Sequence, residues 1–468
     1  MRIWNIVSMT LLCQCCLAQH WQPLGLGLNN NGWATEMYSD TTFNKMFVAG
    51  PFEQVNGDTI WGIASWNGAD WDSLGHGIER HPNSFNSSNT WAMAHMGNYL
   101  YVGGNFTWTG YAPSKSLSRW DGTNWSPIPG GQPNDVVDDM QVYNNELYIC
   151  GVFDSVGNVS ASGIAKWNGS SWQAIGNNYD FEATGAIQRI AFYHGNLYVG
   201  GIFEDPFGNT CRLAKWDGTA WHFMTTDLVG SIADVWSMIV YDDELYVSGL
   251  FYAGIGNNPS NCIMRWNDTT WRDVGGGVDF YSFSTPQVRD MKVHGGKLYC
   301  AGSFEKIGGV MAMGLASWDG TNWCGYNTSF TSNSQETGLM NLEFFNDTLY
   351  VAGGFLIAEG DSMNAIAKWI GGNFVDTCGN TTSISEQESI QEVSVYPNPA
   401  RDEITFEFPN SENRLLIIYD CAGREIWREE NAGMFIKVNV QSFPEGLYFF
   451  SAIGDGEEYV QGKFLIVH

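Results

Sequence analysis

The stretch that decides the fold is LYVGGNF at 100–106, followed by LSRWDGTNW at 117–125. The first part is an apolar run ending in Gly-x-Phe, and the second places two tryptophans on either side of a short turn. The first part recurs as MFVAGPF (46–52), LYVGGNF (100–106), LYICGVF (147–153), LYVGGIF (197–203), LYVSGLF (245–251), LYCAGSF (298–304) and LYVAGGF (349–355). The first tryptophans of the second part are Trp66, Trp120, Trp167, Trp216, Trp266, Trp318 and Trp369. The sequence therefore contains seven copies of one unit.

Each unit predicts four short strands. An opening strand such as MQVY (140–143) leads through a three-residue turn, Asn144-Asn145-Glu146, into the Leu-Tyr strand. Later in the unit, Asp121-Gly122 joins the strand ending at Trp120 to a strand starting at Trp125, and Asp-Gly accepts the positive φ of tight hairpins. The glycine before x-Phe recurs in every unit, which indicates a close backbone approach or a β-bulge.

Four antiparallel strands in a unit of about 40–50 residues are typical of a β-propeller blade. One blade cannot bury both of its faces, so neighbouring blades must cover each other. We therefore predict a seven-bladed β-propeller over residues 19–378, with an open solenoid as the alternative. Two segments are candidates for completing the last blade: Trp21–Gly25, which copies the fourth strand Trp71–Gly75, and Phe374–Cys378.

The units resemble kelch-type propeller repeats over residues 20–378. They share the apolar run, the Gly-Gly pair and two later aromatic residues flanking a turn, but the first aromatic is Trp rather than Tyr. The resemblance implies a propeller. Because kelch-like propellers include both protein-binding modules and sugar-acting enzymes, it leaves the function open.

Composition excludes several classes of function. The chain has 22 Lys+Arg against 50 Asp+Glu, a formal charge of −28, which argues against a nucleic-acid partner or an anionic membrane surface. Its eight histidines show no metal-ligand spacing, and no nucleophile elbow, phosphate loop or calcium loop is present. We therefore predict no metal, no cofactor and no catalytic residue, and we expect a binding module rather than an enzyme.

The N-terminus indicates export. Residues 1–18 have one positive charge, then an apolar run, then small residues, which is typical of a secretory signal peptide cut near Ala18. A membrane anchor is the alternative, but the apolar stretch is short for a span of about 20 residues. No later run of 18 apolar residues exists, so we predict no transmembrane segment in the mature chain.

The C-terminus has a different character. A polar linker at 379–391 precedes strand-like segments at 392–468 that predict a small Ig-like β-sandwich. This region resembles the type A C-terminal sorting domain of the Bacteroidota type IX secretion system, with an ordinary Ig-like binding module as the alternative. The resemblance implies export across the outer membrane, removal of the domain by a sortase, and a secreted or cell-surface product. The matching residues are Tyr396, Pro397, Asn398, Pro399, Gly423, Arg424, Gly446, Tyr448 and Lys463.

Candidate ligand-binding residues lie just before the opening strands, where they should ring the mouth of the central channel. They combine charged and aromatic side chains, a mixture that suits a binding funnel. The predicted ligand is a glycan or another surface protein; the alternative is a propeller enzyme acting on carbohydrate as a lyase, hydrolase or sugar epimerase. These residues are Trp91, Asp139, Arg189, Trp236, Arg289 and Asp290.

Overall fold

The structure is a computed structural model of the 468-residue chain. It describes residues 20–28, 32–79, 89–177, 181, 186–224, 234–253, 258–279, 286–326, 328, 330–332, 335–336, 338–371, 377–378, 394–408, 413–420, 424–432, 434–454 and 459–467. The predicted signal peptide (1–18) and linker (379–391) lie outside these residues. The chain divides into two compact units, Met1–Thr381 and Thr382–His468.

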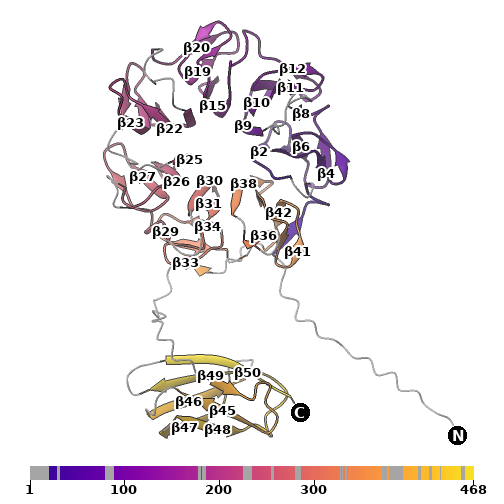
Figure 1. Ribbon diagram of the computed structural model, residues 1–468, viewed down its shortest axis with the longest axis vertical. Coiled ribbons are helices and arrows are strands. Elements are labelled where there is room, and N and C mark those ends of the chain that lie inside the picture. Colours follow the sequence, from indigo (N-terminus) through magenta and orange to yellow (C-terminus); the bar gives the residue numbers. More distant parts are fainter. Residues whose placement is uncertain are drawn as a thin grey trace, which may run out of the picture. The chain divides into compact units, whose positions relative to one another are not determined.

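The first unit is a ring of antiparallel sheets around a common centre (Figure 1), and in the described residues every regular element is a strand. The all-β propeller fold is thereby confirmed. The described residues contain seven such sheets, one for each sequence repeat, numbered here in chain order from sheet 1 to sheet 7. Their innermost strands are β2 (Glu36–Asp40), β9 (Asn89–Met96), β15 (Val137–Tyr143), β21 (Ala186–Tyr193), β25 (Asp234–Tyr241), β30 (Gln287–His294) and β38 (Leu339–Phe345).

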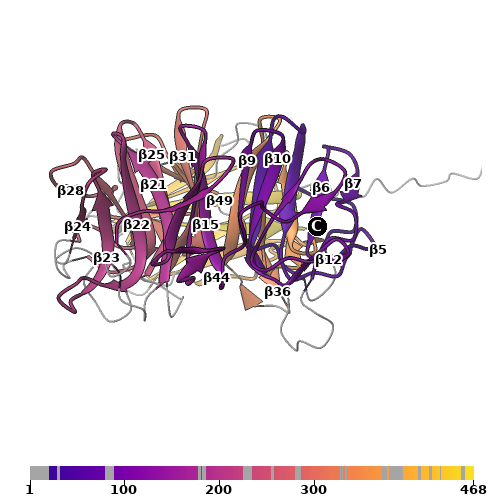
Figure 2. The same cartoon turned by 90° about the horizontal axis from the view of Figure 1, so that it is seen from above.

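Each innermost strand contacts the next one along the chain, and β38 contacts β2, so the ring closes. Figure 2 views the ring edge-on, with the strands of neighbouring sheets standing upright beside one another. The second strands are β3 (Lys45–Ala49), β10 (Tyr99–Asn105), β16 (Glu146–Gly151), β22 (Asn196–Glu204), β26 (Glu244–Leu250), β31 (Lys297–Ser303) and β39 (Thr348–Gly353). The third strands are β6 (Ile63–Trp66), β13 (Leu117–Trp120), β19 (Ile164–Trp167), β23 (Thr210–Trp216), β27 (Ile263–Trp266), β34 (Leu315–Trp318) and β42 (Ile366–Trp369).

In sheets 1 to 6 the outer strand begins at the second tryptophan of the repeat, and in sheet 7 it begins at Trp21. The outer strands are β7 (Trp71–Ser73), β14 (Trp125–Ser126), β20 (Trp172–Ala174), β24 (Trp221–Phe223), β28 (Trp271–Arg272), β35 (Trp323–Gly325) and, in sheet 7, β1 (Trp21–Pro23). Within sheets 1 to 6 the two tryptophans face each other with ring centroids 5.0–5.3 Å apart. In sheets 1, 2, 3 and 6 the indole N–H of the second tryptophan also donates to a carbonyl in the segment that follows the preceding sheet; that of Trp125 donates to Leu74 at 2.7 Å. The Trp pair therefore joins neighbouring sheets as well as neighbouring strands.

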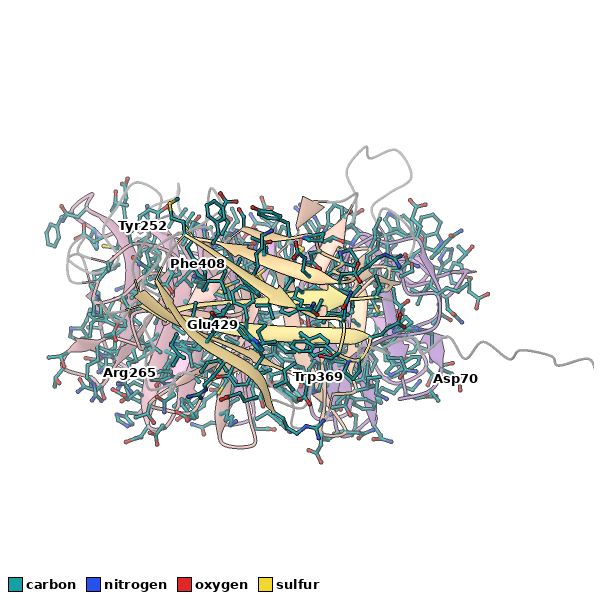
Figure 3. The ribbon with its side chains drawn as sticks, turned by 90° about the horizontal axis from the view of Figure 1, so that it is seen from below. Asp70, Tyr252, Arg265, Trp369, Phe408 and Glu429 are labelled. Atoms are coloured by element: carbon teal, nitrogen blue, oxygen red, sulfur yellow. The ribbon has the colours of Figure 1, made fainter. Side chains whose placement is uncertain are left out.

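Sheet 7 is completed by the N-terminal segment of the ring. Trp21 of β1 is paired with Trp369 of β42, in the register that two tryptophans of one repeat share elsewhere. The Trp21 indole is fully buried and lies 5.0 Å from the ring of Trp369, which Figure 3 labels. Of the two predicted closures, the one by Trp21–Gly25 is the one observed. The other segment forms β43 (Thr377–Cys378), which pairs instead with β35 of sheet 6.

Two local predictions need correction. The turn after β15 has two residues, not three, because Tyr143 pairs directly with Glu146 while Asn144 and Asn145 both adopt positive φ (50° and 60°). The repeat pattern also predicts loops of 10–12 residues between the second and third strands, but the described residues contain small hairpins there in five sheets. Asn56-Gly57, for example, forms the turn between the two strands of one hairpin. The hairpin strands are β4 (Gln54–Val55), β5 (Asp58–Thr59), β11 (Trp108–Thr109), β12 (Ala112–Pro113), β17 (Ser155–Val156), β18 (Val159–Ser160), β32 (Lys306–Ile307), β33 (Val310–Met311), β40 (Ile357–Ala358) and β41 (Asp361–Ser362).

These hairpins are tied to the segment that enters from the preceding sheet. The strand β8 (Ile78–Glu79) pairs with β11, β29 (Val278–Asp279) pairs with β32, and β36 (Phe330–Ser332) pairs with both β40 and β37 (Gln335–Glu336). The described parts of these connections therefore join adjacent sheets through backbone hydrogen bonds.

The second unit consists of two antiparallel sheets around one apolar core. One sheet holds β44 (Ser394–Tyr396), β45 (Glu403–Glu407) and β48 (Phe435–Asn439), and the other holds β47 (Glu425–Ala432), β46 (Asn413–Tyr419), β49 (Gly446–Gly454) and β50 (Tyr459–Ile466). Ile404 and Phe406 from the first sheet pack with Ile418, Phe450 and Phe464 from the second. Among all described residues, no helix has the length and apolarity needed to cross a membrane.

Candidate ligand site at the centre of the ring

The repeated glycine before x-Phe produces a β-bulge in the innermost strand of its own sheet. Built onto Gly104, a Cβ atom would lie 2.1 Å from the carbonyl oxygen of Asn89 across the sheet. The innermost strand runs this close because the pairing register shifts by one residue at the glycine, leaving one residue unpaired. Six sheets show the same shift. The unpaired residues are Trp91, Asp138, Gln188, Trp236, Arg289 and Met340.

The close approach at the repeated glycine predicts that replacing it with alanine destabilises the propeller. In the Gly249→Ala variant the new Cβ would lie 1.9 Å from the carbonyl oxygen of Asp234, so the backbone must shift. We expect the free energy of unfolding to fall by about 3 kcal/mol or more, the upper end of the range for overpacked sites. Thermal and denaturant unfolding of the full chain measures this. The matched control is Gly354→Ala, where no atom lies within 4 Å; an equal loss in both variants would contradict the explanation.

The side chain of the residue after the bulge forms a hydrogen bond to the backbone of the next sheet. The Asp139 carboxylate accepts a hydrogen bond from the backbone N–H of Ile190 at 2.9 Å, and Asp290 accepts from Leu342 at 2.9 Å. Asn341, at the equivalent position, accepts from the N–H of Met37 at 3.0 Å. These bonds join sheet 3 to 4, sheet 6 to 7 and sheet 7 to 1.

Arg189 occupies the same position in sheet 4 and uses donors instead of acceptors. Its Nε donates to the carbonyl oxygen of Trp236 at 2.5 Å, and one terminal nitrogen donates to the carbonyl of Gln188 at 2.6 Å. Arg189 therefore fixes the backbone of two bulge residues in adjacent sheets.

The predicted site residues thus fall into two sets. Trp91, Trp236 and Arg289 are bulge residues, whereas the side chains of Asp139, Arg189 and Asp290 hydrogen-bond to the next sheet or to a bulge backbone. The prediction also missed bulge residues. The alternation of a strand does not reveal which residue a bulge leaves unpaired, but counting back from the repeated glycine would have found Asp138, Gln188 and Met340.

Charged side chains from several sheets meet at the innermost strands. Lys292 and Glu343, on β30 and β38, form an ion pair at 3.1 Å. Burial opposes the charge of Lys292, but the carboxylates of Glu343, Asp290 and Glu36 outweigh it and raise its pKa. Burial raises the pKa of Glu36 to about 8, although Lys292 works in the opposite direction. Charged side chains from sheets 1, 3, 4, 6 and 7 are therefore close enough at the innermost strands to shift one another's pKa.

Several bulge groups have polar atoms with no partner. The indole Nε1 of Trp236 and the side-chain oxygen of Gln188 are buried and make no hydrogen bond to any described residue. Burial raises the pKa of Asp138 to about 6, and Arg189 only partly offsets this effect. Buried polar atoms are normally paired, so the Trp236 nitrogen is able to donate, and the Gln188 oxygen to accept, a hydrogen bond with an incoming molecule. Indole N–H groups away from the bulges, such as those of Trp66, Trp167 and Trp221, are unpaired as well, so the unpaired atoms alone do not single out this end of the ring.

The sorting-motif residues gather at one end of the second unit, where described. Asn398 accepts a hydrogen bond from the N–H of Leu465 at 2.9 Å, which joins the Tyr396–Pro399 turn to the last strand. Arg424 donates to Asp420 at 2.7 Å, and the buried Tyr448 donates to the carbonyl of Pro444 at 2.7 Å. Pro397 and Pro399 both follow cis peptide bonds. Gly446 begins β49, Lys463 is exposed on β50, and Gly423 lies outside the described residues.

Comparison with known proteins identifies the second unit and places the chain outside the cytoplasm. Residues 394–467 match the family described as secretion system C-terminal sorting domain. This domain directs proteins through the type IX secretion system, so the protein is secreted or displayed at the cell surface. No curated protein matches the chain.

Solved structures similar to the chain include PorZ, a surface component of the type IX secretion system of Porphyromonas gingivalis, at 15% identity and a TM-score of 0.42. The alignment covers 93% of this chain but only 59% of PorZ. The extracellular domain of a one component system from B. thetaiotaomicron aligns at 10% identity and a TM-score of 0.33, covering 93% of this chain and 74% of that one. A glycoside hydrolase aligns at 10% identity and a TM-score of 0.25, covering 73% and 98%. The sheet order described above rests on the strand pairings of this chain alone.

Proposed function

We propose that the chain is a seven-bladed, kelch-type propeller that acts outside the cell as a binding module for a glycan or a surface protein. The signal peptide at 1–18 takes it across the inner membrane. The C-terminal Ig-like sandwich then takes it through the type IX machinery, whose sortase removes the sandwich. The domain boundaries follow as 1–18, 19–378, 379–391 and 392–468.

One observation carries the binding function. The bulges place Trp91, Trp236 and Arg289 at equivalent points of three sheets, on backbone held by the sheet rather than by their own side chains. The guanidinium of Arg289 lies 5.2 Å from the centre of the Trp236 ring, so two of these groups already contact each other. Aromatic and arginine side chains on a rigid scaffold are the residue types that dominate binding energy at interfaces.

The experiment is a glycan-array screen of the purified full chain, followed by titration of the best ligand. We expect Trp236→Ala to weaken binding about tenfold or more, since hot-spot residues contribute about 2 kcal/mol or more. Phe207→Ala removes an aromatic side chain that is 89% exposed at another place on the ring, and it should leave affinity unchanged. Equal affinities for all three proteins would show that the ligand binds elsewhere.

A second candidate, an enzyme acting on carbohydrate, is favoured by one observation. Asp138 has a pKa of about 6, and its carboxylate makes no hydrogen bond to another described residue. A carboxyl group of this pKa suits proton transfer near neutral pH. Release of reducing sugar from the array ligands, abolished in Asp138→Asn, would support the enzyme; binding without product formation would support the binding module.

A further inference from the structure

Arg289 carries a positive charge that has no ion-pair partner among the described residues. No described carboxylate lies within ion-pair distance of its guanidinium, although Asp+Glu outnumber Lys+Arg by 50 to 22 in the chain. Burial and the neighbouring positive charge of Arg189 both lower the pKa of Arg289. Arg189 itself is compensated, because it shares its surroundings with Asp138 and Asp139. The Arg289 guanidinium is therefore available to bind an anionic ligand.

The groups next to Arg289 narrow the chemistry of that anion. Its guanidinium lies over the Trp236 ring, whose buried indole N–H is an unpaired donor. Arg189 bonds to the carbonyls of Trp236 and Gln188 and so holds these two bulges next to each other. The side-chain oxygen of Gln188 is a buried, unpaired acceptor. Two donor groups suit a carboxylate, and the acceptor suits a hydroxyl group on the same ligand.

We propose that Gln188, Trp236 and Arg289 form a subsite for an acidic sugar, in which Arg289 and the Trp236 indole hold the carboxylate and Gln188 accepts a hydroxyl. This rests on the proposed binding function and specifies its ligand class.

The test uses tetragalacturonate and its fully methyl-esterified form, in which each carboxyl group loses its charge and gains a methyl group. By titration calorimetry with the full chain, we expect the acid to bind at least tenfold more tightly than the ester. Arg289→Gln should remove most of this difference, because charge-assisted hydrogen bonds to a carboxylate disappear. Arg289→Lys keeps the charge without the planar fork, so it should retain part of the preference.

The matched control is Arg119→Gln. Arg119 also lies over an aromatic ring, that of Tyr99 at 4.1 Å, but it sits on the third strand of sheet 2, and its loss should change neither affinity. Equal binding of acid and ester, or an equal effect of Arg289→Gln on both, would overturn the acidic-sugar subsite while leaving the binding module intact. Tighter binding of a sulfated neutral sugar would assign the subsite to sulfate instead. Failure of every array glycan to bind would instead contradict the glycan-binding function.

Discussion

The Trp21→Ala variant is expected to lose about 3–5 kcal/mol of stability in the propeller unit, the range for removing a large buried aromatic side chain. Trp21 is fully buried, and its indole N–H donates to Thr328 at 3.1 Å. Its ring also packs against Phe330 and Trp369, at centroid distances of 5.3 Å and 5.0 Å. No other described tryptophan takes its place opposite Trp369, so a cavity forms where the ring closes.

Calorimetry of the full chain measures this loss. The matched control is Gln22→Ala, on the same strand, where the side chain is exposed and the backbone pairing with Lys368 persists. We expect this control to lie within about 0.5 kcal/mol of wild type, as surface substitutions usually do. A Trp21→Ala protein as stable as the control would mean that β1 contributes little to closure.

The second large effect is a loss of propeller stability as pH rises. The pKa of Glu36 is raised from its ordinary value of 4.5 to about 8, chiefly by burial. Between these values the folded chain keeps a proton that the unfolded chain releases, so the stability contribution is complete below 4.5 and is lost as pH rises through 8. Integrated over this window of pH, the effect is on the order of 5 kcal/mol.

Other groups face Glu36 and set the size of this effect. Lys292 and Arg189 lower its pKa, while Asp290 and Asp139 raise it. The pKa values of Asp290 and Asp139 are themselves raised by burial, so these groups change stability in the same direction.

Urea unfolding of the full chain at pH 5, 6, 7 and 8 checks this prediction. Glu36→Gln should flatten the curve, removing at most about 1.4 kcal/mol per pH unit. Glu53→Gln, which removes an exposed glutamate, is the control. Parallel curves for Glu36→Gln and wild type would contradict the assignment of the proton to Glu36.

The sequence repeats predicted the sheets of the ring well, because each sheet depends on local features that every copy carries. Trp120 and Trp125 flank a turn that needs only the residues between them, and the same holds in the other sheets from 1 to 6. The closure was harder to predict. Trp21 and Phe374 are both aromatic residues in plausible positions, and only the three-dimensional arrangement decides which one meets Trp369.

The candidate site was predicted in part, for a physical reason. The residues near the opening strands were recognised as central, but a bulge moves each side chain by one position relative to simple alternation. Glu36, Lys292 and Glu343 were missed because their meeting depends on strands from sheets 1, 6 and 7, which lie far apart in the sequence. The small hairpins had a usable signal, Asn56-Gly57 between short apolar segments, that was not used.

The bulges have a consequence for how such a protein changes over time. The glycine across the strand determines that a residue will be unpaired, and it does so whether that residue is Trp91, Gln188 or Met340. The glycine therefore determines where the unpaired residue lies, while the codon of that residue alone determines which side chain it has. Single codon changes at the six bulge positions change the side chains there and leave the sheets of the ring intact. We therefore expect these six positions to diversify faster in evolution than the strands that carry them.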